Sequence, residues 1–152
     1  MATLNEGDKA PGFTAKDQNG KTVSLSDFAG KRVILYFYPK DDTPGCTAEA
    51  CDFRDNYQSM LSKGFQVIGV STDDEKSHKK FETKYSLPFP LVADTDKSIV
   101  EAYGVWVEKN MYGRKYMGTA RKTFIINADA VIDKIIDKVD TKNSSQQVFD
   151  LL

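Results

Sequence analysis

The chain has 152 residues, of which 40% are hydrophobic and 28% are charged, and its formal net charge at pH 7 is −1. This length supports one hydrophobic core and predicts a single domain over residues 1–152. The composition excludes a disordered chain. The near-neutral charge provides no attraction to nucleic acid or to an anionic membrane surface, so neither is expected as a partner.

Two further features concern the compartment. No apolar run approaches the roughly 20 residues that a membrane-spanning helix needs, and residues 1–6 lack the basic start and apolar stretch of a signal peptide. We therefore expect a cytoplasmic protein. Its two cysteines are Cys46 and Cys51. In a reducing compartment, two neighbouring cysteines are more often catalytic or redox-active than joined in a permanent disulfide.

The first predicted elements are a hairpin and a buried strand. Asn19-Gly20 lies within residues 13–24 and favours a two-residue turn, so a short N-terminal hairpin is expected there. The continuous apolar run of residues 33–38 predicts a strand buried on both faces, as in the centre of a parallel sheet. Pro39 ends this strand.

A helix is expected next, from Pro44 to about Ser62, with Gly64 closing it. Thr43 is a suitable N-cap, and Pro44 suits the first helical position because no helical N–H is needed there. The later predicted elements are a strand over 65–71, a helix over 74–85, a strand over 91–93, a helix over 97–103, a hairpin of 123–126 with 131–139, and a helix over 144–152. Such alternation, with an antiparallel hairpin, predicts a mixed α/β sheet with helices on both faces.

Cys46 lies where the first buried strand turns into the following helix, in the segment YPKDDTPGCTAEAC of residues 38–51. A thiol at a helix N-terminus lies at the positive end of the helix dipole and can accept hydrogen bonds from free backbone N–H groups. An unperturbed thiol, with a pKa of about 8.5, is mostly protonated at neutral pH. The position of Cys46 therefore predicts an activated nucleophile.

A thiolate that attacks a peroxide also needs groups that polarise the O–O bond. Thr43, three residues before Cys46, can place its hydroxyl within reach of the sulfur or of a bound peroxide, and Pro39 and Pro44 are expected to shape the loop and shield it from water. Arg121, just ahead of the predicted buried strand of residues 123–126, is the clearest candidate for the cation. An arginine stays charged at any working pH and can donate two hydrogen bonds to the peroxide. Its rivals on charge alone are Arg32, Arg54 and Arg114.

These residues carry a resemblance to a known family. The pattern Pro39-x-x-x-Thr43-x-x-Cys46 resembles the active-site signature of peroxiredoxins, and YPKDDTPGCTAEACDFRD resembles the bacterioferritin comigratory protein/peroxiredoxin Q subfamily. The similarity continues through GVSTDDEKSHKKFETKYSLPFPLVADTD, EAYGVW and TARKTFIIN, which extends it over nearly the whole chain. The resemblance implies a thioredoxin-like fold with a mixed central sheet, helices on both faces and an N-terminal hairpin.

The resemblance also implies a function, the thiol-dependent reduction of hydrogen peroxide and organic hydroperoxides. Cys46 matches the peroxidatic cysteine and Cys51 the resolving cysteine, which would form an intramolecular disulfide that thioredoxin or a glutaredoxin reduces. The other matching positions are Pro39, Thr43, Arg121 and Glu49, of which Glu49 would orient the arginine. A monomer is implied, because both cysteines belong to one chain. Since GGLG and C-terminal YF motifs are missing, resistance to overoxidation is implied as well.

The spacing of the two cysteines creates a structural problem. Five residues of regular helix rise about 7.5 Å and turn about 500°, which places the Cα atoms of Cys46 and Cys51 about 8–9 Å apart. A disulfide rarely tolerates more than about 7 Å. The first turn or two of the helix must therefore unwind after Cys46 is oxidised to sulfenic acid.

Several residues have a second interpretation. Either cysteine could be a small buried core residue, and Cys51 could belong to the helix face of a one-cysteine enzyme. Glu49 could simply be a favourable acid in the first helical turn. His78 is expected to be a surface or capping residue. Trp106 and Met117 could belong to the core or to the apolar rim of the peroxide pocket.

Other functions are weighed against the peroxidase. A zinc site is not expected, because two cysteines and His78 fall short of four ligands at the usual spacing, and no cofactor is needed when sulfur performs the chemistry. A thioredoxin-type oxidoreductase would require C-x-x-C. The remaining alternative is a redox sensor or holdase switched by the same disulfide. Turnover distinguishes the two, because a sensor is oxidised only once.

Overall fold

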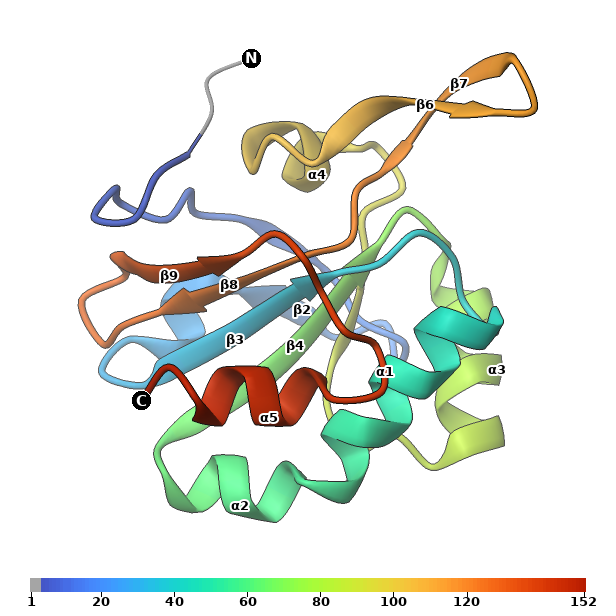
Figure 1. The fold of residues 1–152 in the computed structure, drawn as a ribbon. Helices are drawn as coiled ribbons and strands as arrows, with labels where there is room; N and C mark the ends of the chain where they lie inside the picture. Colours follow the sequence, from blue (N-terminus) through green and yellow to red (C-terminus); the bar gives the residue numbers. More distant parts are fainter. Residues whose placement is uncertain (1–3) are drawn as a thin grey trace.

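The computed structural model describes residues 4–152; residues 1–3, part of the N-terminal segment considered above, lie outside the described residues. The main sheet has seven strands in the order β2-β1-β5-β4-β3-β8-β9 (Figure 1). Their bounds are β1 Thr14–Lys16, β2 Thr22–Ser24, β3 Arg32–Phe37, β4 Phe65–Ser71, β5 Leu91–Ala93, β8 Lys122–Ile126 and β9 Ile132–Ile136. A separate ribbon pairs β6 Trp106–Met111 with β7 Arg114–Thr119.

The sheet is mixed, as predicted. Strand β3 runs parallel to β4, and β4 runs parallel to β5. The remaining neighbours pair antiparallel, including β3 with β8 and the N-terminal hairpin of β1 with β2. The helices are the 3-10 turn η1 Leu25–Phe28, α1 Pro44–Asp55, α2 Tyr57–Ser62, α3 Glu75–Tyr85, α4 Ser98–Ala102 and α5 Ser144–Phe149.

Helices cover both faces of the sheet, which divides the core into two clusters. Along β3, Val33, Leu35 and Phe37 point into the cluster that contains residues of α4 and η1. Ile34 and Tyr36 point into the other cluster, with residues of α1, α2, α3 and α5. This alternation is the two-residue period of a strand that is buried on both faces. In Figure 1, α4 lies above the sheet, and α1, α2, α3 and α5 lie below it and to its right.

The predicted helix from Pro44 to Ser62 is wrong in one respect, because it is two helices. Asn56 leaves the helical conformation with φ −107° and ψ 8°, and its side-chain amide donates to the Asp52 carbonyl at 2.8 Å. An asparagine side chain that competes for a helix carbonyl in this way favours a helix end. Helix α1 therefore ends at Asp55, and α2 starts at Tyr57.

Two turns also differ from the expectation. The N-terminal hairpin is confirmed, but its loop is longer than the two residues expected, because Asp17 accepts hydrogen bonds from the backbone N–H groups of Asn19 and Lys21. Such an Asx-type turn replaces the tight turn. The β6–β7 ribbon was not predicted. It turns at Tyr112-Gly113, both with positive φ, and it projects from the sheet (Figure 1). Most of its side chains are exposed. Without a buried face, its sequence lacks clear alternation.

None of the helices within residues 4–152 is long and apolar enough to cross a bilayer.

Candidate active site

The start of α1 carries the first of the two cysteines. Thr43 precedes the helix in an extended conformation, with φ −98° and ψ 156°, and Pro44 occupies its first turn. The Thr43 carbonyl accepts the first helical hydrogen bond, from Thr47 N at 2.8 Å. Cys46 lies within this first turn, is only 1% exposed and packs into the same core cluster as Tyr36 and Phe53. Its sulfur therefore experiences the positive end of the helix dipole in a nearly dry setting.

Arg121, the residue just before strand β8, contacts Cys46. Its Nη2 donates to Cys46 Sγ at 3.4 Å, and its Nη1 donates to Glu49 Oε1 at 3.2 Å. This contact follows from the sheet register, since β3 pairs antiparallel with β8 and ends opposite Lys122, next to Arg121. Gly45 keeps the approach open, because a Cβ atom there would lie 3.1 Å from Arg121 Nη2.

The rival arginines have other positions. Arg32 donates to the Lys63 carbonyl, Arg54 donates to the Tyr85 carbonyl, and Arg114 lies exposed in the β6–β7 ribbon. The structure therefore places Arg121 beside the sulfur, where charge alone could not distinguish it.

Glu49 is fully buried one turn after Cys46 and connects α1 to α5. Its Oε2 accepts from Ser144 Oγ at 3.0 Å, and its Oε1 accepts from Arg121. Burial raises the pKa of Glu49 to about 7, although Arg121 and Ser144 act in the opposite direction. Burial also opposes the charge of Arg121, but the neighbouring Cys46 and Glu49 outweigh it and hold the pKa of the guanidinium above its usual value.

Further predicted site residues are Thr43, Pro39, Trp106 and Met117. The Thr43 hydroxyl donates to the Lys40 carbonyl at 3.0 Å, which fastens it to its own loop. Pro39, Trp106 and Met117 contribute to one cavity of about 270 Å³. Trp106 is half-buried and also packs against a core cluster, whereas Met117 is half-exposed.

Lys109 lines the same cavity and is a cation that the sequence did not identify. Burial, and then the nearby charge of Arg121, lowers the pKa of Lys109, while Cys46 acts to raise it. No signal pointed to Lys109, because strand β6 itself was not predicted.

Cys51 lies in the same uninterrupted helix as Cys46. Both cysteines are free, and Cys51 is half-buried. Because α1 runs without a break from Pro44 to Asp55, the helix geometry that keeps the two sulfurs apart is present in this reduced state.

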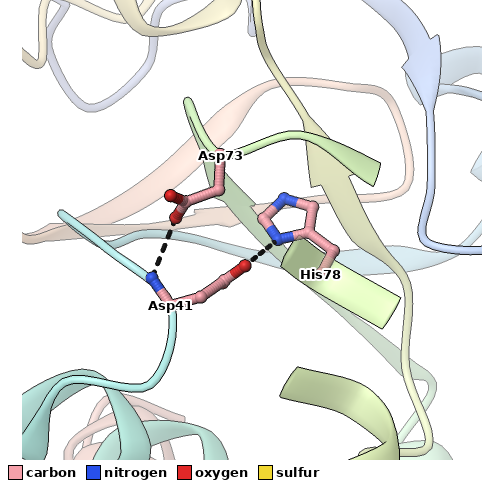
Figure 2. A group of neighbouring side chains, drawn as sticks. All are labelled: Asp41, Asp73 and His78. Carbon is pink, nitrogen blue, oxygen red and sulfur yellow. Dashed lines mark hydrogen bonds and ion pairs between the residues drawn. The ribbon is translucent and has the colours of Figure 1, made fainter. Parts of the chain in front are cut away.

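The expectation that His78 is a surface or capping residue is wrong. His78 is fully buried in α3 instead of lying at the surface. Its Nδ1 lies 2.6 Å from Asp41 Oδ2, and its Nε2 lies 3.0 Å from the Val92 carbonyl. The contact between His78 and Asp41 is the dashed line that joins them in Figure 2. The helical period places His78 and Phe81 together on the inner face of α3. The sequence alone contains no sign of the partners that make this burial possible.

Comparison with known proteins decides the family. The model of the AhpC/TSA family matches residues 6–135. The chain is a peroxiredoxin of this family. A protein of Bacillus subtilis named peroxiredoxin Bcp is 44% identical over 150 residues, which cover 99% of this chain and 96% of the relative. These matches also place the peroxiredoxin in the bacterioferritin comigratory protein/peroxiredoxin Q group that its motifs resemble.

Solved structures confirm the fold of this peroxiredoxin as thioredoxin-like. A mutant of PrxQ from Xylella fastidiosa superposes with a TM-score of 0.93 at 31% identity, covering 99% of this chain and 96% of the other. A bacterioferritin comigratory protein of Xanthomonas campestris, described for alkyl peroxide reduction, superposes with a TM-score of 0.86 at 34% identity, covering 91% and 88%. The chain is accordingly an enzyme of the peroxidase class.

The buried carboxyl of this peroxiredoxin should make its stability depend on pH. The pKa of Glu49 is about 7 in the folded protein and 4.5 for the free side chain. Between these values the folded state binds the extra proton, so the contribution of Glu49 to stability falls as the pH rises through that window. Glu49→Gln removes this effect. We expect its free energy of unfolding, relative to the wild type, to rise by about 1–3 kcal/mol between pH 5 and pH 8.

Urea unfolding at pH values across this window measures the difference. The control is Glu108→Gln, which changes an exposed glutamate in β6 and should give a difference that is independent of pH. A Glu49→Gln difference that stays constant, or that falls with rising pH, would contradict the raised pKa of Glu49.

Proposed function

We propose that Cys46 is the peroxidatic cysteine of a thiol peroxidase that reduces hydrogen peroxide and organic hydroperoxides. The Cys46 thiolate attacks one oxygen of the hydroperoxide, and the O–O bond breaks. The sulfur takes that oxygen as sulfenic acid, and the other oxygen leaves, with a proton, as water or an alcohol. The sulfur is oxidised by two electrons and the peroxide is reduced by two.

The observation that carries this proposal is the contact of Arg121 with Cys46 at the N-terminus of α1. The guanidinium donates to the sulfur, and the helix start adds its positive dipole. Both stabilise negative charge on sulfur and on the departing oxygen. Glu49 holds the second nitrogen of the guanidinium, so it orients Arg121 toward the sulfur. Thr43 and Pro39 complete the loop against which the peroxide would bind.

The substrate class is supported by the cavity next to the site. Trp106 and Met117 provide an apolar lining close to Pro39, which suits the organic part of a hydroperoxide. The Xanthomonas campestris relative is described for alkyl peroxide reduction, in agreement with this substrate class.

We further propose that Cys51 resolves the sulfenic acid. Its thiol attacks the sulfur of Cys46, water leaves, and an intramolecular disulfide forms once the first turn of α1 has unwound. A dithiol protein, thioredoxin or a glutaredoxin, then exchanges its own thiols with this disulfide and is oxidised in turn. The cycle needs both cysteines of one chain and no partner subunit, which supports a monomer acting as one domain.

Turnover tests this function. The reduced protein is mixed with hydrogen peroxide, thioredoxin, thioredoxin reductase and NADPH, and NADPH oxidation is followed. We expect many equivalents of NADPH to be consumed per protein, and none above background for Cys46→Ser. Cumene hydroperoxide in place of hydrogen peroxide tests the organic substrates.

Two outcomes would contradict the proposal. Oxidation of a single equivalent, with both thioredoxin and glutaredoxin as donors, would indicate the sensor or holdase. Undiminished turnover by Cys46→Ser would show that Cys46 is not the peroxidatic residue.

A further inference from the structure

The loop between β3 and α1 is fastened to helix α3 by two consecutive aspartates. Asp41 Oδ2 accepts from Ser77 Oγ at 2.8 Å and lies 2.6 Å from His78 Nδ1. The carboxylate of Asp42 accepts from Lys84 Nζ and Tyr85 Oη, both at 2.8 Å. This loop leads directly into Thr43 and the first turn of α1, so contacts that fix it also fix the position of Cys46.

Asp41 is also held from the sheet side. Its Oδ1 accepts from Tyr38 Oη at 2.7 Å, and its backbone N donates to Asp73 Oδ2 at 2.8 Å. Burial, and then the negative charge of Asp41, raises the pKa of Tyr38 well above its ordinary value, so this phenol donates its proton. Asp73 is itself held by Ser71 Oγ at 2.7 Å. Figure 2 shows Asp41 between Asp73 and His78.

The hydrogen bonds of His78 determine where its protons are. The Val92 carbonyl can only accept, so Nε2 carries a proton. Nδ1 faces a carboxylate oxygen at 2.6 Å, which requires a second proton between these two atoms. Ligand atoms of Asp41, Asp73 and His78 lie within 4.8 Å of one another, a spacing that also suits a metal ion. Both nitrogens of His78 already face oxygen acceptors. Shared protons, and not a metal ion, therefore explain why these three side chains lie so close together.

We propose that His78 is a positioning residue for the peroxide reaction, which acts through Asp41 to hold the loop of residues 39–43, and with it Thr43 and Cys46, in the reactive conformation. This inference rests on the proposed role of Cys46. The contact that matters is the one from Nδ1 to the loop. The contact from Nε2 to Val92 anchors His78 to β5 and does not touch the loop.

Two substitutions separate these contacts. The side-chain amide of His78→Asn branches from Cγ, as Nδ1 does, so it keeps a donor toward Asp41 and loses Val92. The amide of His78→Gln extends one atom further, as Nε2 does, so it keeps Val92 and loses Asp41. Both variants lose one of two buried hydrogen bonds, so each serves as the stability control of the other.

The test measures the rate of Cys46 oxidation by hydrogen peroxide in stopped flow, with the free energy of unfolding of each variant. We expect His78→Gln to slow this step by about tenfold or more and His78→Asn to stay within about threefold of the wild type. Equal slowing in both, or slowing that follows the loss of stability, would overturn the proposal. So would unchanged rates in both.

Amide hydrogen exchange of residues 40–46 provides a readout that does not depend on peroxide chemistry. We expect faster exchange in His78→Gln than in His78→Asn. Equal exchange in the two variants would overturn the proposal that His78 holds the loop through Asp41. If the wild type itself fails to react at Cys46, the proposed function fails while this exchange test still applies.

A further variant is available if His78→Gln does not fold. Ser77→Ala removes a half-buried donor to the same Asp41 oxygen and should slow oxidation of Cys46 two- to fivefold. An unchanged rate would overturn the proposal.

Discussion

Arg121→Ala is expected to slow the reaction of Cys46 with hydrogen peroxide by about 10²- to 10³-fold at pH 7, the usual effect of removing one preorganised donor from developing negative charge. Arg121 is the side chain that donates to the sulfur, at 3.4 Å, from a position that is largely shielded from water. Stopped-flow oxidation of the reduced protein at several peroxide concentrations measures the rate constant.

Three further variants define the reason for this loss. Arg121→Lys retains the charge but cannot reach both Cys46 and Glu49 with a planar fork, so an intermediate loss is expected. Arg121→Ala combined with Glu49→Gln removes the buried carboxyl that would lose its partner, and should recover stability without recovering the rate. Arg114→Ala changes an exposed arginine of β7 and should leave the rate unchanged. A rate for Arg121→Ala within threefold of the wild type would refute the role of Arg121.

Cys51→Ser should leave the first oxidation step nearly unchanged and reduce thioredoxin-dependent turnover by about 100-fold or more. The sulfenic acid of Cys46 would form, but serine cannot condense with it, so no disulfide is presented to the reductant. The two steps are separated by measuring the oxidation rate in stopped flow, and turnover by NADPH consumption. Full turnover by Cys51→Ser would show that Cys51 is not the resolving residue.

The same variant tests where α1 unwinds. The second half of α1 is anchored, since Asp52 Oδ2 accepts from Ser145 N at 2.7 Å and Phe53 is fully buried. In the first turn, Cys46 is buried, but Pro44 is exposed and Gly45 and Thr47 are half-buried. We therefore expect oxidation of the wild type to accelerate amide exchange over residues 44–50 and to leave Phe53 protected. Oxidised Cys51→Ser has no disulfide to hold the turn open, so its exchange should accelerate less. Equal protection of α1 in both redox states would rule out the unwinding.

Local sequence patterns predicted most of the elements, because each depends on neighbouring residues. The apolar run that became β3 and the run of residues 65–71 that is β4 needed only their composition. The start of α1 needed only Thr43 and Pro44. The break at Asn56 was not predicted, because it depends on a hydrogen bond from the Asn56 side chain to the Asp52 carbonyl, which leaves only a weak local signal. The β6–β7 ribbon was not predicted, because a ribbon without a buried face shows no clear alternation.

The sequence by itself determined the family, most of the main-sheet strands and the helices, and the placement of Cys46 at a helix N-terminus, because these depend on motifs and short-range periodicity. Only the tertiary structure decided which arginine lies beside the sulfur, through the pairing of β3 with β8. It also joined Glu49 to Ser144 across 95 positions and His78 to Asp41 across 37. Burying such polar groups requires partners that lie far away in the chain, and packing alone brings those partners together.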